Sequence, residues 1–436
     1  MAELFVGIDW GSRTHTVCVV DAQGEKVLET EVAHRGDDVL AFVDELTKLA
    51  KGDLSRVVAA MESPHGVMVE VLLERRVVTY SINPKQLDRF RDRHSNGGAK
   101  DDDLDAFVLA DSLRTDLKLY RVITLPEPQM MQLSALCRSY ESLTEQVLAL
   151  ANQIRELLVR YYPQMRELGD WHDESWLWDL FEAAPMPSLT AAPTRANPRG
   201  LSAQKVGAIL KKHNIRRHDP KLVLSGLRST PLPVAPGVAE AASTQIASLL
   251  PVLRAAHQQR SQCSKNMKQL LSAFQKEADS PEKTHHDAAL LLSLPGIGVH
   301  NGAVMLTEAA LALQQRDYQA LRRLAGAAPV SKRTGGKTSR PGRQPTSKPN
   351  LPRVEQRQAC NRRLREATYH WGRVAAQCDP RTRQHYADLR ARGHSHGRAI
   401  RGVVDRLFKV LLAVLNSGLP YNQERRSAQK IHPRAA

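Results

Sequence analysis

The chain has 436 residues, which is enough for two or three domains with sizeable hydrophobic cores. Its 62 lysines and arginines exceed its 46 aspartates and glutamates, and the net charge of +16 indicates a polyanionic partner, nucleic acid before anionic membrane. No apolar run approaches the roughly 18 residues that a spanning helix needs, and no signal peptide opens the chain, so we expect no membrane role. The five scattered cysteines form no CxxC pair and fit reduced cytosolic thiols better than disulfides or zinc ligands.

The first 123 residues predict an α/β domain. Apolar runs and helical spacings give, in order, strand 4–12, strand 15–21, strand 26–32, helix 36–50, strand 56–61, helix 67–76, strand 77–82, helix 85–91 and a helix after Lys100. Such an order implies an antiparallel hairpin sheet that is continued by parallel strands with crossover helices. By analogy it matches the ribonuclease-H-like fold.

Acidic residues mark three places in this domain. Four of them open the last helix, at Asp101, Asp102, Asp103 and Asp105. They could simply be a helix start that the dipole favours, and Asp9 and Glu62 could simply end their strands. Alternatively, Asp9, Glu62 and the i, i+3 pair Asp102 and Asp105 converge on one side of the sheet. Converging carboxylates repel one another unless a cation neutralises them, and all-oxygen ligands predict Mg²⁺ or Mn²⁺ in two-metal phosphodiester chemistry.

Residues 124–284 carry two heptad patterns, at 136–161 and at 246–274. The patterns fit an antiparallel helix hairpin, a dimerising coiled coil or an ordinary bundle core. A module of about 162–240 is inserted between them. It contains three tryptophans, Trp171, Trp176 and Trp178, for which an aromatic core is favoured over stacking on bases.

Residues 285–420 predict a mainly helical domain, and 421–436 predict a disordered tail. The LPGIG segment at 294–298 lies between two apolar helices and is helix-hairpin-helix-like, so it could bind a phosphate or could be a plain turn. Residues 321–365 hold thirteen lysines and arginines but one acid, Glu355, which predicts a surface for phosphate backbones or a disordered basic loop. A last helical pattern at 403–415 should pack the end of this domain.

Several motifs together resemble the DEDD-type insertion-sequence transposases, the group that also contains the Piv-type DNA invertases. In residues 1–115 the motifs are GIDWGSRTH with Asp9, AMESPHG with Glu62, and K-x-D-x-x-D-A with Asp102 and Asp105. In residues 286–417 they are LPGIG, LAGAAPV and RQACNRRLREATYHW. The resemblance implies a RuvC-like nuclease domain in which these four acids hold Mg²⁺, a coiled-coil oligomerisation segment, and a second domain with a nucleophilic serine.

The serine loop of the family differs in this chain. Residues 329–337 read PVSKRTGGK, which places Thr334 where the family has its serine, with Ser331 as a less well aligned alternative. The extra methyl group of a threonine crowds an in-line displacement, but its hydroxyl can still attack phosphorus. Nucleic-acid contacts are assigned to the cations of this region, at Lys332, Arg333, Lys337, Arg340, Arg362 and Arg363.

The resemblance also implies partners and a location. Members recombine DNA, several are guided by a structured RNA from the element, and we expect a homo-oligomer in the bacterial cytoplasm, at the nucleoid. The favoured function is therefore a DNA transposase or recombinase. A RuvC-like structure-specific endonuclease that uses water, and a non-catalytic nucleic-acid-binding protein, remain as alternatives.

Overall fold

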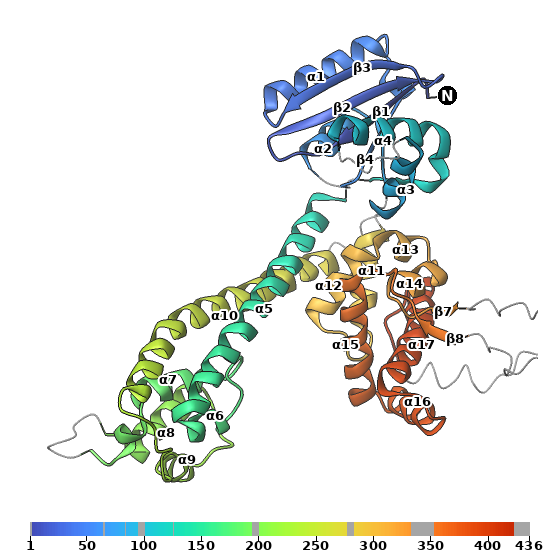
Figure 1. Ribbon diagram of the computed structural model, residues 1–436. Coiled ribbons are helices and arrows are strands. Elements are labelled where there is room, and N and C mark those ends of the chain that lie inside the picture. The colour runs from blue at the N-terminus through green and yellow to red at the C-terminus, as the bar shows by residue number, and fades with distance from the viewer. Residues whose placement is uncertain are drawn as a thin grey trace, which may run out of the picture. The chain divides into compact units, whose positions relative to one another are not determined.

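The computed structural model describes residues 2–63, 66–82, 84–94, 101–124, 126–193, 200–276, 283–332 and 353–422. The chain divides into two compact units, Met1–Glu127 and Pro128–Ala436, and each is described by itself (Figure 1). None of the helices in the described ranges has the length and apolar character needed to span a bilayer. Most of the expected disordered tail, from residue 423 on, lies outside the described residues.

The N-terminal unit is a sheet of six strands with helices. The strands are β1 (Leu4–Asp9), β2 (Thr14–Asp21), β3 (Lys26–Ala33), β4 (Val57–Met61), β5 (Val78–Ser81) and β6 (Arg121–Val122). The helices are α1 (Gly36–Leu49), α2 (Val67–Glu74), α3 (Pro84–His94) and α4 (Asp102–Asp116). The sheet order is β3-β2-β1-β4-β5-β6, in which β4 runs parallel to β1 and β5 while the other pairs are antiparallel. The predicted order through α4 is confirmed, and β6 was missed because two residues carry no periodicity.

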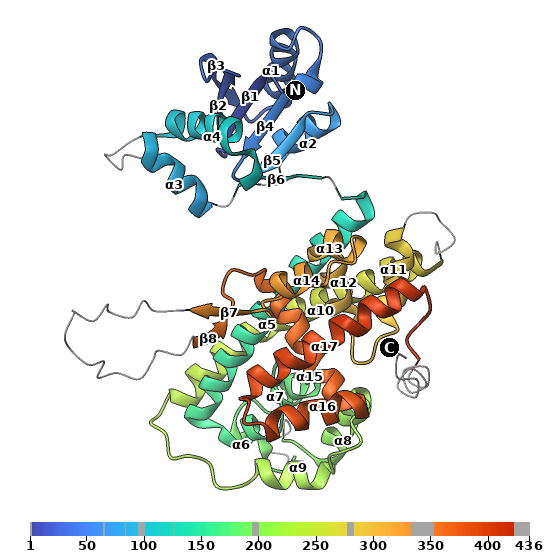
Figure 2. The ribbon, with the colours of Figure 1, turned by 90° about the vertical axis from the view of Figure 1, so that its right-hand side faces the viewer.

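Both faces of this sheet are covered by helices. Side chains alternate along a strand, so Val6 and Ile8 of β1 pack with α1 and α2, while Phe5 packs with α4. Figure 2 shows α1 and α2 on one side of the sheet and α3 and α4 on the other. Each strand side chain therefore lies on one of the two faces of the sheet. The acids predicted above concern the face that α4 covers.

Gly7 allows α4 to lie directly on β1. A Cβ at this position would stand 2.0 Å from the carbonyl oxygen of Ala106 and 2.5 Å from the backbone nitrogen of Ala110. Only glycine permits such a close approach of a helix backbone to a strand. The contact fixes where α4 begins relative to the end of β1.

The C-terminal unit starts with two long helices, α5 (Pro128–Tyr161) and α10 (Val238–Lys276). The beginning of α5 packs on the end of α10, where the sulfur atoms of Cys137 and Met267 are 3.7 Å apart. Val147 and Ile154, further along α5, share a core with the first half of α10. The two heptad faces therefore meet each other in an antiparallel pair within one chain (Figure 1).

The helices between α5 and α10 form the inserted module. They are α6 (Pro163–Glu167), α7 (Ser175–Ala183), α8 (Ala203–Lys212) and α9 (Pro220–Leu227). Trp171, Trp176 and Trp178 are at most 1% exposed, which confirms the aromatic core and leaves none of the three for stacking on bases.

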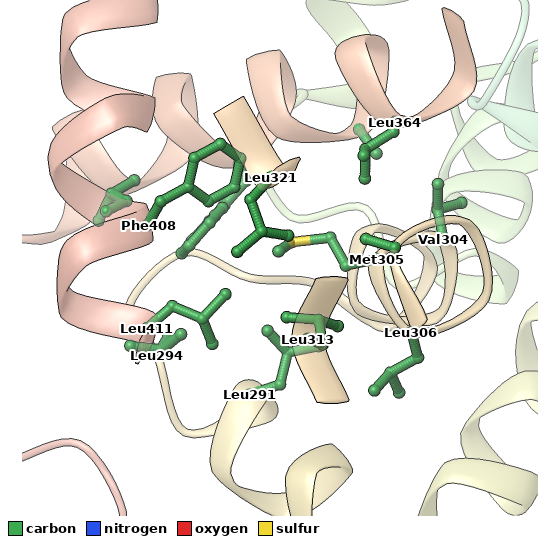
Figure 3. Close-up of a cluster of buried hydrophobic side chains, with 14 of the residues drawn as sticks. Leu291, Leu294, Val304, Met305, Leu306, Leu313, Leu321, Leu364, Phe408 and Leu411 are labelled. Carbon is green, nitrogen blue, oxygen red and sulfur yellow. The ribbon is translucent and has the colours of Figure 1, made fainter. Parts of the chain in front are cut away.

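The rest of the unit is mostly helical, as predicted. Its elements are α11 (Lys283–Leu292), α12 (Val299–Glu308), α13 (Ala310–Gln314), α14 (Tyr318–Leu324), β7 (Pro329–Lys332), β8 (Arg353–Gln356), α15 (Arg362–Cys378), α16 (Pro380–Ala391) and α17 (His396–Ser417). Figure 3 shows leucines, Met305 and Phe408 from α11 to α17 in one apolar core. The pattern at 403–415 lies inside α17 and packs into this core, with Phe408 fully buried.

The LPGIG turn has a packing role in this core. Gly296 has φ +75°, and a Cβ there would stand 2.5 Å from the backbone nitrogen of Ala375 in α15. The indole nitrogen of Trp371 donates to the carbonyl of Pro295 at 3.0 Å. Close packing on α15 thus explains the glycine, and the expected helix-hairpin-helix phosphate site is not confirmed.

Candidate active site

Asp9 and Glu62 lie at the same edge of the sheet. Asp9 ends β1, and Glu62 follows β4 directly. These strands are parallel neighbours with Ile8 opposite Met61, so their carboxyl ends meet. Because side chains alternate, Asp9 has the same side as Gly7, which is the side that α4 covers.

The first turn of α4 brings further acids to that edge. Asp101 is the N-cap, and its carboxylate accepts a hydrogen bond from the backbone N–H of Asp103 at 3.3 Å. Asp102 and Asp103 are exposed in the first turn, where the helix dipole favours negative charge. A helix start therefore explains Asp101, which caps α4. Asp102 makes no such cap and remains a candidate metal ligand.

An open cavity of about 970 Å³ joins these acids. Asp9, Glu62 and Asp102 all line it. The other lining residues are Trp10, Gly11, Ser12, Arg13, Thr14, Thr16, Glu31, Ser63, Pro84, Asp101 and Asp103. Six of these lining residues are carboxylates and one, Arg13, is a cation. Carboxylates gathered around one cavity repel one another, and a bound cation would relieve the repulsion.

Asp105 is placed differently from the expectation. Its side chain is buried, 2% exposed, and it does not line the cavity. Arg91 of α3 donates two hydrogen bonds to it, from Nε to Oδ1 at 2.5 Å and from Nη2 to Oδ2 at 2.7 Å. The contact with Asp105 raises the pKa of Arg91, which keeps the guanidinium charged. The structure thus brings three of the four predicted acids to one cavity and pairs the fourth with an arginine.

The donor chemistry of the cavity fits a hard divalent cation. Carboxylate oxygens from Asp9, Glu62 and Asp102 are the ligand type that Mg²⁺ and Mn²⁺ prefer. In the described part of the chain, no three His, Cys, Asp or Glu side chains are close enough together to hold a metal ion as they lie. A coordinating arrangement therefore requires these side chains to move toward one another.

Sequence reasoning missed two contributors to the site. Arg91 lies 14 residues before Asp105, and its role depends on how α3 packs on α4, which no periodicity reveals. Glu31 stands opposite Thr16 in the β2–β3 hairpin, and both line the cavity. The hairpin register could have placed Glu31 beside the end of β1, since Thr16 also faces Asp9.

One of the two hydroxyl candidates, Ser331, belongs to the β7–β8 pair in the C-terminal unit. Ser331 is exposed on β7, opposite Val354 of β8. The backbone of Lys332 ends the same strand. Four further predicted residues lie outside the described residues, in the 333–352 connection between the two strands: Arg333, Thr334, Lys337 and Arg340.

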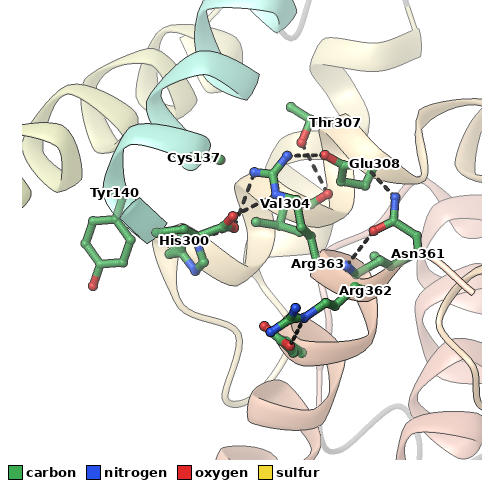
Figure 4. Close-up of polar contacts among 12 residues, drawn as sticks. Cys137, Tyr140, His300, Val304, Thr307, Glu308, Asn361, Arg362 and Arg363 are labelled. Carbon is green, nitrogen blue, oxygen red and sulfur yellow. Dashed lines mark hydrogen bonds and ion pairs between the residues drawn. The ribbon is translucent and has the colours of Figure 1, made fainter. Parts of the chain in front are cut away.

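Arg362 and Arg363 have different environments (Figure 4). Arg362 is exposed and pairs with Glu366 at 3.0 Å on the same helix. Arg363 binds Glu141 of α5, with Nε to Oε2 at 2.7 Å, and also Glu308 of α12. Burial alone would raise the pKa of Glu141, but hydrogen bonds from His300 and Arg363 hold it below its usual value. Arg363 therefore ties three helices together, and its contact with nucleic acid stays a prediction.

A mixed sheet that presents an acid-lined cavity at its strand ends, followed by a mostly helical unit, fits a transposase with a DEDD nuclease-like domain. Residues 6–163 match the DEDD-type IS110 model described as "Transposase", and residues 288–387 match the model described as "Transposase IS116/IS110/IS902 family". The chain therefore belongs to the IS110/IS116/IS902 family of transposases, which confirms the resemblance that the motifs indicated.

Known relatives agree with this assignment. The chain is 30% identical, over 99% of its length and 98% of the relative's, to the "Mini-circle putative transposase for IS117" of Streptomyces coelicolor. It is 37% identical to the "Putative transposase y4uE" of Sinorhizobium fredii over 49% of this chain and 58% of that one. An "Insertion element IS110 uncharacterized 43.6 kDa protein" of Streptomyces coelicolor is 27% identical over 96% of this chain and 95% of the relative's.

Proposed function

We propose that this transposase cuts and rejoins DNA with a divalent metal ion held in the acid cavity of its N-terminal unit and a hydroxyl nucleophile from the β7–β8 connection. The observation that carries the proposal is the cavity itself, where strand ends and a helix start bring Asp9, Glu62 and Asp102 together. So many carboxylates at one open edge are hard to account for by stability alone, because their mutual repulsion is unfavourable.

Each acid has a distinct part in this proposal. Asp9 and Glu62 would hold the ion from the sheet edge, and Asp102 would hold it from α4. Mg²⁺ or Mn²⁺, when bound, would polarise the scissile phosphate and offset its developing charge. Asp105 would complete the set if its pair with Arg91 opens, and otherwise it fixes α4 through α3.

The covalent step would be carried by Thr334, or by Ser331. The hydroxyl oxygen forms a bond to phosphorus as the bond from phosphorus to a sugar oxygen breaks. The hydroxyl proton passes to a base, and the sugar oxygen leaves as a hydroxyl after it gains a proton. The neighbouring cations Lys332, Arg333 and Lys337 would hold the phosphate during this exchange. Arg340 and Arg362 would contact the nucleic-acid backbone nearby.

The expected partners follow from this chemistry. They are the DNA ends of the element, its target DNA, a structured guide RNA and a second copy of the chain, which would meet at the bacterial nucleoid. The excess of positive charge over the whole chain, +16, supports contact with more than one phosphate backbone.

A trapping experiment tests the covalent step. The full chain is incubated with Mg²⁺ and element-end DNA, then denatured and resolved on a gel. We expect a protein–DNA adduct from the unchanged chain, and none from Thr334→Ala or from Asp102→Ala. Loss of the adduct in Ser331→Ala, with retention in Thr334→Ala, would move the nucleophile to Ser331.

The same gel separates the other candidate functions. Cleaved DNA without any adduct would contradict the covalent step and favour an endonuclease that uses water. Bound but intact DNA under every condition would favour a non-catalytic nucleic-acid-binding protein.

A further inference from the structure

A second charged cavity, of about 220 Å³, lies in the C-terminal unit at the base of the β7–β8 pair. Three arginines line it, Arg322 from α14 and Arg398 and Arg401 from α17, and His394 from the preceding turn joins them. We call it the arginine cavity. Its volume is below the roughly 300–1,000 Å³ typical of sites for drug-sized ligands. It therefore suits a small group rather than a whole nucleoside.

The positive charge of the arginine cavity is only partly balanced. Arg322 is paired with Asp405, which also lines the cavity. Arg401 donates to the side-chain oxygen of Gln356 at 3.2 Å, which is a neutral partner. Arg398 has no ion-pair partner among the described residues, and its charge stands one helical turn from that of Arg401. Glu355 is the other acid in the lining.

Two like charges on one face of a helix repel each other, and the surroundings of Arg398 and Arg401 make these charges still less favourable. Burial lowers the pKa of Arg401, and the nearby charge of Arg398 lowers it further. Arg398 lies in the first turn of α17, where the helix dipole disfavours cations, and that turn contains no acid. His394 also lines the cavity, and its Nδ1 is buried without a hydrogen-bond partner among the described residues. An anion between Arg398 and Arg401 would relieve their repulsion and offset the unfavourable dipole.

We propose that the arginine cavity binds one phosphate of a nucleic-acid backbone, through Arg398 and Arg401, and so anchors the strand beside the hydroxyl loop. The site deepens the proposed function, because it names where the C-terminal unit holds the strand that the hydroxyl attacks. Pro329 of β7 and Gln356 of β8 both line the cavity, so it adjoins the two strands that bracket the 333–352 connection.

The length of chain between the cavity and Thr334 limits how far the anchored phosphate can lie from the scissile one. Thr334 follows Pro329 by five residues, and an extended chain of that length reaches at most about 17 Å. With about 3.4 Å of rise per nucleotide on one strand, the anchored phosphate lies within roughly five nucleotides of the scissile phosphate.

Binding of the full chain to nucleic acid, without divalent metal, tests the proposal. Fluorescence anisotropy is measured over a range of salt with EDTA present, on an element-end DNA duplex and on an RNA of the same sequence. Because contact with one duplex phosphate contributes about 0.9 to the slope of log K against log salt, Arg398→Gln with Arg401→Gln should reduce that slope by about 1. We also expect about tenfold weaker binding near physiological salt.

A control variant outside the cavity and two single-residue variants accompany the double variant. Arg373→Gln removes an exposed arginine of α15 that does not line the cavity, and should leave affinity and slope unchanged. Arg398→Gln alone decides the matter if the double variant does not fold, and Arg398→Lys should keep most of the slope. A loss on the duplex alone assigns the phosphate to DNA, and a loss on RNA alone assigns it to a guide RNA.

Equal affinity and slope for the double variant and Arg373→Gln, on both nucleic acids, would overturn the proposal. Since no cleavage occurs in EDTA, this outcome is independent of the trapping experiment. The arginine cavity can hold a phosphate even if the covalent step is wrong, and the covalent step can hold even if the cavity binds nothing.

Discussion

Replacing Gly7 with alanine should unfold the N-terminal unit or destabilise it by about 3 kcal/mol or more. The new Cβ would stand 2.0 Å from the carbonyl oxygen of Ala106 and 2.5 Å from the backbone nitrogen of Ala110. Both are backbone atoms of α4, so neither can rotate away as a flexible side chain would. Relief requires the whole helix to move off β1, and the acid turn would leave the sheet edge with it.

Denaturant titration of the full chain, with amide hydrogen exchange to follow β1 and α4, measures this effect. Gly36→Ala is the matched control, because a Cβ there meets nothing within 4 Å, and its effect should stay within about 0.5 kcal/mol. If Gly7→Ala proved as stable as Gly36→Ala, the close contact between α4 and β1 would be wrong.

Replacing Arg91 with leucine should destabilise the same unit by about 3 kcal/mol, because removal of one partner leaves a buried charge uncompensated. Asp105 is 2% exposed, and both its oxygens are bound by Arg91. Arg91 itself is 21% exposed at its side chain, which places the effect at the lower end of the usual range of about 3–5 kcal/mol.

Mg²⁺ then reports on whether Asp105 is a ligand. If it is, added Mg²⁺ replaces the missing cation and should stabilise Arg91→Leu more than the unchanged chain, as measured by thermal unfolding. Arg89→Leu, an exposed neighbour on α3, is the control, with little expected change. Equal unfolding of the Arg91 and Arg89 variants would show that the pair with Asp105 does not hold α3 on α4.

Much of the N-terminal unit could be predicted because its signals are local. The apolar run before Asp9 and the one before Glu62 each predicted a strand, and the crossover order made the two strands parallel neighbours. Convergence of these acids then followed from topology alone. The pairing of Asp105 with Arg91 could not be predicted, because it depends on the packing of two helices whose connection carries no pattern.

The C-terminal unit shows what a count of charges leaves out. Thirteen cations in 321–365 predicted a surface for phosphates, but composition does not reveal which of them have partners. Arg363 proved to be tied to Glu141 and Glu308, far away in sequence. In the same way, the glycine of the LPGIG turn looked like a phosphate loop, while its close contact is with the backbone of Ala375.

The most direct test is a calorimetric titration of the full chain with Mg²⁺, comparing the unchanged protein with Asp9→Asn, Glu62→Gln and Asp102→Asn. Loss of outer-shell partners alone typically weakens metal binding about 10–100-fold, so loss of a ligand should weaken it at least about tenfold. Asp116→Asn, at the far end of α4 and outside the cavity, should bind Mg²⁺ like the unchanged chain. Identical titrations for all five proteins would mean that the three carboxylates do not form a metal site.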